Sequence, residues 1–393
     1  MTIRKAAIRR QLHRLPLIKH QARLSNRNCQ ELKSPVTLCK IRTATGSNRN
    51  RQRGKALKWL EQKIRRYEHK RWAEEPNRRS LPFGWGLEHI LESPNGTAPR
   101  VLLDRFAAET IQSSDSWFAA TPAEDYALKD GVLTFTSQIA SPWPENNRVH
   151  AQFFPVQNAR AAVVVLAQWN AKWEEQQGVC HWLNRKGLTA IKMSLPYHDR
   201  RSIPGHPRAD HLVGPNIGLT LQANRQALLD VKRVLRWLEI QGYDRLGIIG
   251  TSIGSCIGFI TMCHEPAIRA GAFLHVSTYF GEVVSQGLTT MNVWEPMKQY
   301  ISREEAIRYW SPISPFPYIP KLRGSGKKIL TITGNYDPTF WPELTAQFLA
   351  ELRQNGVKFE HLGLPCGHYS LGVTPFSQIV GYRFGKFLAE ALS

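Results

Sequence analysis

Ser252 is the residue of this sequence best placed to act as a nucleophile. It lies in Gly250-Thr251-Ser252-Ile253-Gly254, which fits the pattern G-x-S-x-G. Residues 245–250 predict a buried strand and the residues after Ser252 predict a helix, so the serine is expected at a sharp strand–turn–helix bend, a nucleophile elbow. The flanking glycines relieve the crowding of such a bend. The helix N-terminus offers free N–H groups to a developing oxyanion, so the pattern indicates acyl-transfer chemistry.

A serine hydroxyl needs a base to take its proton and an acid to orient that base. Asp337 follows a strand predicted over residues 328–333, and His368 follows one predicted over residues 358–364. Both positions are the carboxyl ends of strands, where ligands bind in open α/β sheets, and the chain order is Ser, Asp, His. We therefore predict a triad in which His368 takes and returns the proton of Ser252 and Asp337 holds the imidazole.

Other residues compete for the roles of acid and base. Asp337 is also typical of a turn residue that caps a helix, and Glu282, after a strand predicted over residues 270–277, is the main rival acid. The rival histidines are His275, His361 and His198. The first two fall within predicted strands, where a core or surface role is expected. His198 follows an earlier strand and is better suited to line a pocket.

The elements that must position these residues alternate along the chain from about residue 101. Strands are predicted at 131–141, 148–156, 161–168, 188–195, 245–250, 270–277, 328–333 and 358–364. Residues 161–168 are continuously aliphatic, as a strand covered on both faces requires. Helical patterns, the longest at 219–240, separate the later strands, so the fold class is α/β, with a mostly parallel central sheet and helices on both faces. An aromatic insert at about 278–320 predicts a small helical cap that excludes water from an apolar pocket.

The positive charge of the chain is concentrated at its start. The 393 residues carry a net charge of +21; residues 1–80 hold 23 basic and 5 acidic side chains, whereas the rest hold 29 and 26. We expect a basic tail at 1–54 and a single domain at 55–393. Three interpretations of the tail stay open: a disordered tail or an over-long start, an arm for an anionic partner such as nucleic acid or a membrane surface, and an organelle transit peptide.

The cysteines and the apolar runs indicate the compartment. The six cysteines form no C-x-x-C pair and no zinc-like spacing with histidine, so neither a disulfide framework nor a zinc site is expected. No apolar run near the start is long enough for a secretory signal, and no stretch resembles a transmembrane segment. The expected localisation is therefore cytoplasmic.

Several longer stretches resemble one superfamily. They are 82–88 (PFGWGLE), 168–171 (QWNA), 194–201 (SLPYHDRR), 250–255 (GTSIGS), 311–318 (SPISPFPY) and 364–369 (LPCGHY). Together they make residues 55–393 similar to the α/β-hydrolase superfamily, and more narrowly to a bacterial branch related to abhydrolase-domain-containing protein 18. The resemblance implies a mostly parallel eight-stranded sheet and a Ser252/Asp337/His368 triad. It implies no particular substrate.

The stretch after the third strand of the superfamily differs from that of many lipases and esterases. They carry His-Gly-Gly-Gly there, whereas this sequence has Ala167-Gln168-Trp169-Asn170. Because backbone N–H groups serve whatever the side chain is, we expect the oxyanion hole from Ile253 and Trp169, with the side-chain amide of Asn170 as the alternative donor.

The stretch 197–201 leaves two interpretations open. It is either a surface turn or part of the substrate pocket, lined by Tyr197, His198 and Arg200. In the second case the arginine would hold an anionic group of the substrate.

The function expected from these features is hydrolysis of a carboxylic ester, or a related small-molecule acyl compound, through an acyl-serine intermediate. No metal and no organic cofactor is implied. An amidase, peptidase or thioesterase would use the same triad. The alternative from another class is a non-catalytic α/β-hydrolase scaffold that binds a partner or a lipid through its cap.

Overall fold

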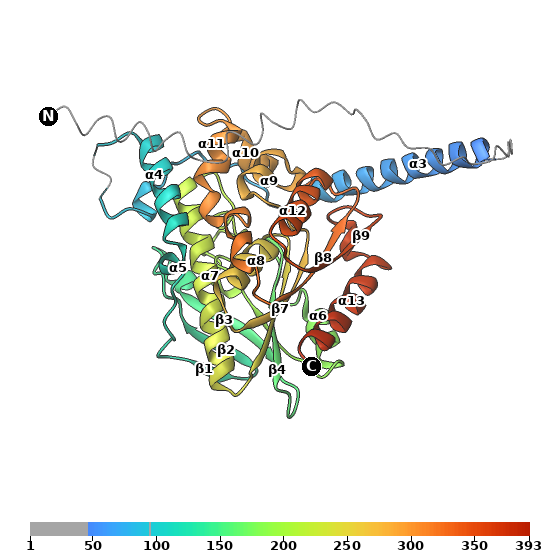
Figure 1. The fold of residues 1–393 in the computed structure, drawn as a ribbon. Helices are drawn as coiled ribbons and strands as arrows, with labels where there is room; N and C mark the ends of the chain where they lie inside the picture. Colours follow the sequence, from blue (N-terminus) through green and yellow to red (C-terminus); the bar gives the residue numbers. More distant parts are fainter. Residues whose placement is uncertain (1–45, 94–95) are drawn as a thin grey trace. The chain divides into compact units, whose positions relative to one another are not determined.

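The computed structural model describes residues 46–93 and 96–393 (Figure 1). The chain divides into two units, Met1–Lys55 and Ala56–Ser393, and the second contains the sheet and the candidate site. Of the predicted tail at 1–54, residues 1–45 lie outside the described residues, and helix α3 (Gly46–Ala73) begins at the next position. Among the described helices, none has the length and apolar composition needed to span a membrane.

One sheet organises the described domain. Its strands are β1 (Ala127–Lys129), β2 (Val132–Thr136), β3 (Arg148–Phe154), β4 (Ala161–Leu166), β5 (Thr189–Met193), β6 (Arg245–Thr251), β7 (Ile268–Leu274), β8 (Lys328–Gly334) and β9 (Phe359–Leu364). In the described residues the strand order is β1-β2-β3-β5-β4-β6-β7-β8-β9. The pairs from β5 to β9 are parallel, and those among β1, β2, β3 and β5 are antiparallel. The predicted mostly parallel sheet is confirmed.

The sheet has one strand more than the eight that the resemblance implies, because β1 and β2 form an edge hairpin. Asp130 and Gly131 connect them, and both have positive φ, of 51° and 73°. An Asp-Gly pair in this conformation is the connection that matches the twist of a two-residue hairpin. All three residues of β1 are exposed, so the strand has no periodic apolar pattern to reveal it.

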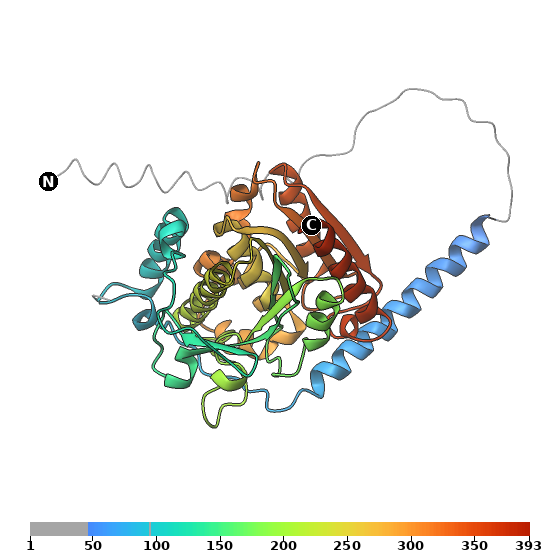
Figure 2. The ribbon, with the colours of Figure 1, turned by 90° about the horizontal axis from the view of Figure 1, so that it is seen from below.

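The helices of the domain cover both faces of the sheet. They are α4 (Pro99–Gln112), α5 (Ser114–Trp117), α6 (Gln177–Asn184), α7 (Ile217–Ile240), α8 (Ile253–His264), α9 (Phe280–Gln286), α10 (Met291–Met297), α11 (Arg303–Tyr309), α12 (Pro342–Gln354) and α13 (Phe376–Ala391). Figure 2 shows α7 on one side of the sheet and α13 on the other.

Two apolar cores correspond to the two faces of the sheet. Val164 and Leu166 of β4 belong to the core shared with α7, α8 and α12. Val163 and Val165 belong to the core shared with α6 and α13. A strand with apolar residues on both faces has to be covered on both sides, which is why 161–168 reads as an uninterrupted aliphatic run.

A helical insert joins β7 to β8, as the sequence predicts for 278–320. Its elements are α9, α10, α11 and three 3₁₀ helices at Leu288–Thr290, Ser311–Ile313 and Phe316–Leu322. Tyr309, Trp310 and Tyr318 of the insert are at most 1% exposed and belong to the same apolar core as α7 and α8. The insert also contacts the loop that follows β8, because the N–H of Leu288 donates to the carbonyl of Pro338 at 3.0 Å.

Candidate active site

Ser252 lies at the bend between β6 and α8. Its φ of 54° and ψ of −118° are strained for a residue with a side chain, at a cost of about 1–3 kcal/mol. The flanking glycines make the bend possible. A Cβ atom at Gly250 would lie 2.2 Å from the carbonyl oxygen of Gly254, and one at Gly254 would lie 2.5 Å from that of Leu166. The backbone therefore packs closely enough to hold the serine at the N-terminus of α8.

The candidate residues gather at the carboxyl ends of four neighbouring strands, β6 to β9. The N–H of Ser252 donates to the carbonyl of Leu274 at 2.8 Å, which ends β7. Asp337 follows β8 and His368 follows β9. Parallel strands end at the same edge of a sheet, so residues far apart in sequence share one edge.

Asp337 and His368, the residues predicted as acid and base, contact each other in the structure. Nδ1 of His368 lies 3.1 Å from Oδ2 of Asp337. The other oxygen, Oδ1, accepts the N–H of Thr339 at 2.7 Å and the N–H of Phe340 at 2.9 Å. The side chain of Asp337 is 1% exposed. The two backbone donors fix the carboxylate so that its second oxygen faces the imidazole.

Burial and charge act in opposite directions on both groups. Burial raises the pKa of the Asp337 carboxyl, but the facing imidazoles of His368 and His275 outweigh it and hold this pKa well below its ordinary value. Burial lowers the pKa of His368, whereas the charge and hydrogen bond of Asp337, with the charges of Glu68 and Glu75, raise it by more. The acid is thus ionised at neutral pH, and the base is more basic than an ordinary histidine.

A second histidine, His275, touches the same carboxylate. Its Nδ1 lies 2.7 Å from Oδ2 of Asp337, although its N–H is not aligned for a regular hydrogen bond. The ring centroid lies 4.4 Å from that of His368. The sequence places His275 inside a strand, but β7 ends one residue earlier and His275 takes a φ of 57°. The predicted strand at 270–277 therefore extends too far, because the β-branched Val276 is typical of a strand and no glycine or proline marks the turn.

His275 is largely uncharged at neutral pH. Burial, together with the cationic form of His368, lowers its pKa more than Asp337 raises it. It therefore contacts Asp337 as a neutral dipole rather than as a competing cation.

In the described part of the chain, the hydroxyl of Ser252 forms no hydrogen bond with Asp337 or His368. The residue is 8% exposed, and its hydroxyl forms no hydrogen bond within the described part of the chain. Two of the rival groups, Glu282 and His361, have other surroundings. Glu282 is half-buried on α9, and His361 is exposed on β9, with its Nδ1 3.0 Å from Oγ1 of Thr331.

The expected oxyanion donors differ in whether their N–H groups already donate to another group of the protein. The backbone N–H of Asn170 donates to Nε2 of His198 at 2.9 Å, and its side-chain oxygen accepts the N–H of Ala209 at 2.9 Å. The N–H groups of Trp169 and Ile253 have no acceptor among the described residues. The end of β4 touches the start of α8, since a Cβ atom at Gly254 would lie 2.6 Å from the carbonyl of Ala167. The two unoccupied donors therefore belong to adjoining segments beside the serine.

His198 has a defined tautomer. Its Nε2 accepts from Asn170, so Nδ1 carries the proton and donates to the carbonyl of Pro196 at 2.9 Å. Complete burial, with smaller effects of nearby cations, lowers the pKa of this imidazole to about 4, which keeps it neutral. His198 thus holds the turn that contains Trp169.

The other two residues expected in the substrate pocket have different surroundings. Tyr197 is 2% exposed and packs edge-to-face on Trp143. The guanidinium of Arg200 lies 4.4 Å from the ring centroid of Trp173 on the surface. Their loop is held by Arg201, which is fully buried and pairs with Asp230 at 2.9 Å.

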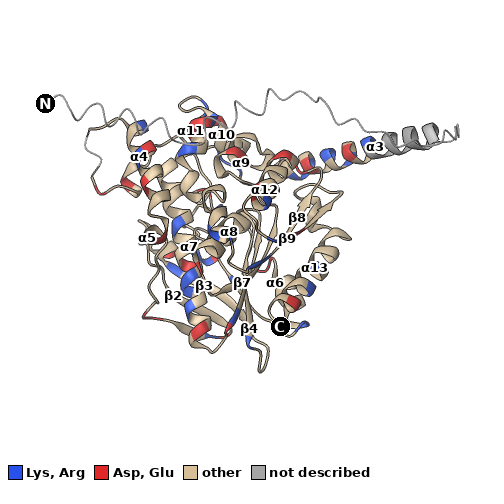
Figure 3. Cartoon of the chain, in the orientation of Figure 1, with Lys and Arg blue, Asp and Glu red and all other residues tan. Residues whose placement is uncertain are grey.

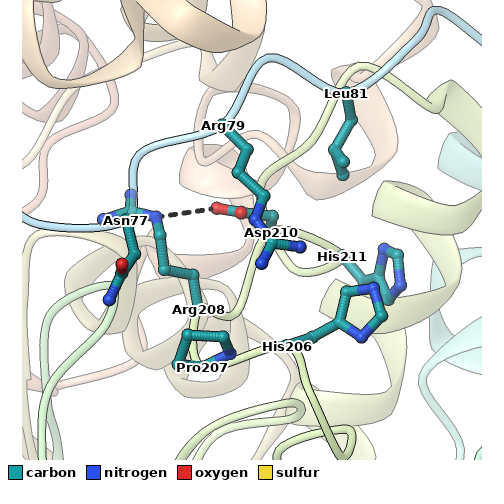
Figure 4. Close-up of a pocket in the computed structure, with 8 residues that line it drawn as sticks. All are labelled: Asn77, Arg79, Leu81, His206, Pro207, Arg208, Asp210 and His211. Atoms are coloured by element: carbon teal, nitrogen blue, oxygen red, sulfur yellow. Dashed lines mark hydrogen bonds and ion pairs between the residues drawn. The ribbon is translucent and has the colours of Figure 1, made fainter.

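A small pocket borders this region (Figure 4). Arg79 and Arg208 reach it from separate segments of the chain and point toward Asp210. Nε of Arg208 lies 3.2 Å from Oδ1 of Asp210, and its guanidinium lies 5.0 Å from the ring centroid of Trp169. The pocket thus adjoins the turn that contains Trp169, one of the expected oxyanion donors.

One group in the described part of the chain has the donor atoms and the closeness to hold a metal ion. It consists of His275, Asp337 and His368, whose ligand atoms lie within 4.8 Å of one another. These are the atoms that join the acid to the two imidazoles. A metal ion there would compete with the acid–base pair for the Nδ1 atom of His368.

Comparisons with known proteins agree with this architecture. A sequence model of the prolyl oligopeptidase family matches residues 219–372, the stretch from α7 to the loop of His368. No curated protein matches the chain.

Solved structures share the fold at low identity. Acetyl xylan esterase 1 from a Thermoanaerobacterium species has a TM-score of 0.52 and 13% identity, covering 75% of this chain and 94% of that one. The acylaminoacyl peptidase of Pyrococcus horikoshii has a TM-score of 0.50 and 14% identity, covering 68% of this chain and 42% of that one. The protein has the α/β-hydrolase fold, which confirms the prediction. The narrower resemblance to the branch of abhydrolase-domain-containing protein 18 stays a prediction.

Proposed function

We propose that this protein is a serine hydrolase that cleaves a carboxylic ester of a small molecule through an acyl-serine intermediate. The observation that carries the proposal is the contact between His368 and Asp337 at the sheet edge where the strained Ser252 elbow ends β6. The match to the prolyl oligopeptidase family over 219–372 independently supports a serine hydrolase of the α/β-hydrolase type.

The reaction proceeds in two halves. Oγ of Ser252 attacks the carbonyl carbon while its proton passes to Nε2 of His368, and the carbonyl oxygen becomes an oxyanion. The N–H groups of Trp169 and Ile253 stabilise that charge. The tetrahedral intermediate collapses, the proton is returned to the leaving alkoxide, and an alcohol departs from the acyl-serine. Water then repeats the sequence and releases the carboxylic acid.

In this proposal, the hydrogen bond between Ser252 and His368 forms when the substrate binds. Hydrogen bonds of catalytic groups are commonly loose in ligand-free enzymes and tighten in the complex. Ionised Asp337 stabilises the imidazolium that forms, because its second oxygen already faces Nδ1 of His368.

A fluorophosphonate probe tests the proposal, because it modifies activated serines. We expect labelling of the wild type and none of Ser252→Ala. Ser116→Ala is the matched control, because Ser116 is an exposed serine away from the sheet edge. A folded wild type that is not labelled would favour the non-catalytic scaffold, and labelling that persists in Ser252→Ala would move the nucleophile elsewhere.

A peptide or amide substrate is the second candidate. The family match favours it, because the matched family is that of prolyl oligopeptidase. Paired p-nitrophenyl ester and p-nitroanilide substrates with the same acyl group separate the candidates. An esterase releases product from the first only, whereas a peptidase also cleaves the anilide. A thioester of the same acid extends the series to the third acyl class.

A further inference from the structure

One face of helix α3 carries apolar residues every four positions, but the next position on that face is a carboxylate. Leu60 is half-buried and Ile64 is 8% exposed, and the next position on that face is Glu68, which is 0% exposed. The described part of the helix otherwise carries charges of both signs on its exposed faces (Figure 3). A fully buried carboxylate is costly unless hydrogen bonds satisfy it, so its partners show what it does.

Every partner of Glu68 belongs to the loop that follows His368. Oε2 accepts the N–H of Tyr369 at 2.7 Å. Oε1 accepts the N–H of Ser370 at 2.9 Å and its hydroxyl at 2.7 Å. No lysine or arginine in the described part of the chain forms an ion pair with this carboxylate. The three donors alone compensate its burial.

These contacts close the loop around His368. The hydroxyl of Ser370, which donates to Glu68, also accepts the N–H of Gly367 at 2.7 Å. A Cβ atom at Gly367 would lie 2.5 Å from Cδ of Glu68, so the carboxyl group packs directly on the residue before the histidine. The residues on both sides of His368 are therefore anchored to one carboxylate.

We propose that Glu68 is a positioning residue that holds the loop of His368, so that the N-terminal helix α3 is part of the hydrolytic machinery. The proposal rests on the proposed function for its catalytic consequence, but not for the contacts themselves. Glu75, farther along the chain, adds a second tie, because its Oε1 accepts the hydroxyl of Tyr369 at 3.1 Å. The segment before the sheet thus holds the loop of His368 through two carboxylates.

The negative charge of Glu68 also acts on the imidazole. Burial lowers the pKa of His368, and the charges of Asp337, Glu68 and Glu75 raise it. Replacing Glu68 by glutamine removes one of these charges while one oxygen remains to accept from the loop. The acid limb of the pH–rate profile should therefore move to lower pH, because less stabilisation of the cation means a lower pKa.

The test compares Glu68→Gln, Glu68→Ala and the control Glu61→Gln. Glu61 lies on the same helix and pairs with the exposed Arg65 at 3.0 Å instead of the loop. Three measurements are made: the titration of His368 by NMR, the rate of fluorophosphonate labelling against pH, and thermal unfolding. We expect labelling of Glu68→Ala to slow by about 100-fold, as a misplaced catalytic group commonly does. Glu68→Gln should lower the pKa of His368 and slow labelling less, and Glu61→Gln should match the wild type.

The outcomes separate the two proposals. If the NMR titration shifts in Glu68→Gln but the wild type is never labelled, the proposed function fails and the anchoring role stands. If the wild type is labelled and both Glu68 variants react and titrate like it, the anchoring role is refuted. A purely structural role would lower the unfolding temperature without moving the pKa of His368. Should Glu68→Ala not fold, Ser370→Ala replaces it, since it removes one donor and keeps the carboxylate.

Discussion

Replacement of Asp337 by asparagine is the sharpest perturbation of the candidate site. The N–H groups of Thr339 and Phe340 both point at one oxygen of Asp337, at 2.7 and 2.9 Å. An asparagine in this place keeps its single oxygen toward these two donors, because the reverse orientation would face N–H groups with an NH₂. Its amide hydrogens then point at the ring of His368.

That orientation forces the wrong tautomer of the base. Nδ1 of His368 must accept from the amide, so the proton moves to Nε2, which can no longer take the proton of Ser252. The loss should be about 10⁴-fold in kcat, the effect of tautomer inversion in a serine triad, or about 5 kcal/mol of transition-state stabilisation. The variant removes no side-chain volume, so packing should be nearly unchanged.

The assay is the rate of p-nitrophenyl ester hydrolysis together with fluorophosphonate labelling, and thermal unfolding verifies the fold. Glu282→Gln serves as the matched control, because it neutralises the half-buried rival acid on α9. Activity of Asp337→Asn within tenfold of the wild type would refute the reasoning. Loss in Glu282→Gln instead would transfer the orienting role to that residue.

Four further outcomes follow from the same contacts. Burial lowers the pKa of His368, but the surrounding carboxylates raise it by more. On acidification, kcat/KM should therefore begin to fall at a higher pH than the ordinary histidine pKa of 6.5 predicts. An acid limb of the pH–rate profile with a pKa below 6.5 would contradict this prediction. His275→Ala removes a contact to the ionised acid and should reduce kcat/KM about tenfold, as the loss of roughly 1.4 kcal/mol does; an unchanged rate would make it a packing residue only. Gly254→Ala forces a Cβ within 2.6 Å of two carbonyl oxygens and should lower the free energy of unfolding by about 1–3 kcal/mol in urea titrations. His198→Ala deprives the N–H of Asn170 of its acceptor and should lower kcat about tenfold with little change in KM, since the loosened turn carries an oxyanion donor; a change confined to KM would argue against that role.

Two truncations distinguish the N-terminal tail from helix α3. Deletion of residues 1–54 leaves Glu68 and its contacts, so hydrolysis should persist, and any salt-dependent binding of DNA through the basic tail should be lost. Deletion of residues 1–73 removes the anchor of the His368 loop and should abolish labelling. Equal activity of the two truncated chains would show that α3 has no part in the reaction.

Local patterns in the sequence determined the sheet and the chain order of the candidate triad. The aliphatic run at 161–168, the glycines around Ser252 and the loops after the last two strands each express a local constraint, because burial on two faces, a sharp turn and a strand end all leave a pattern in adjacent residues. All eight strands predicted in this way are present.

Only the tertiary structure decided which groups meet across the sheet edge. His275 and Glu68 lie inside apolar patterns and look like misplaced core residues, yet the first touches Asp337 and the second holds the loop of His368. The occupied N–H of Asn170 likewise depends on His198, which a different loop supplies. Such contacts join residues 28 to 301 positions apart. No local periodicity records them, because they depend on how the strands and helices pack.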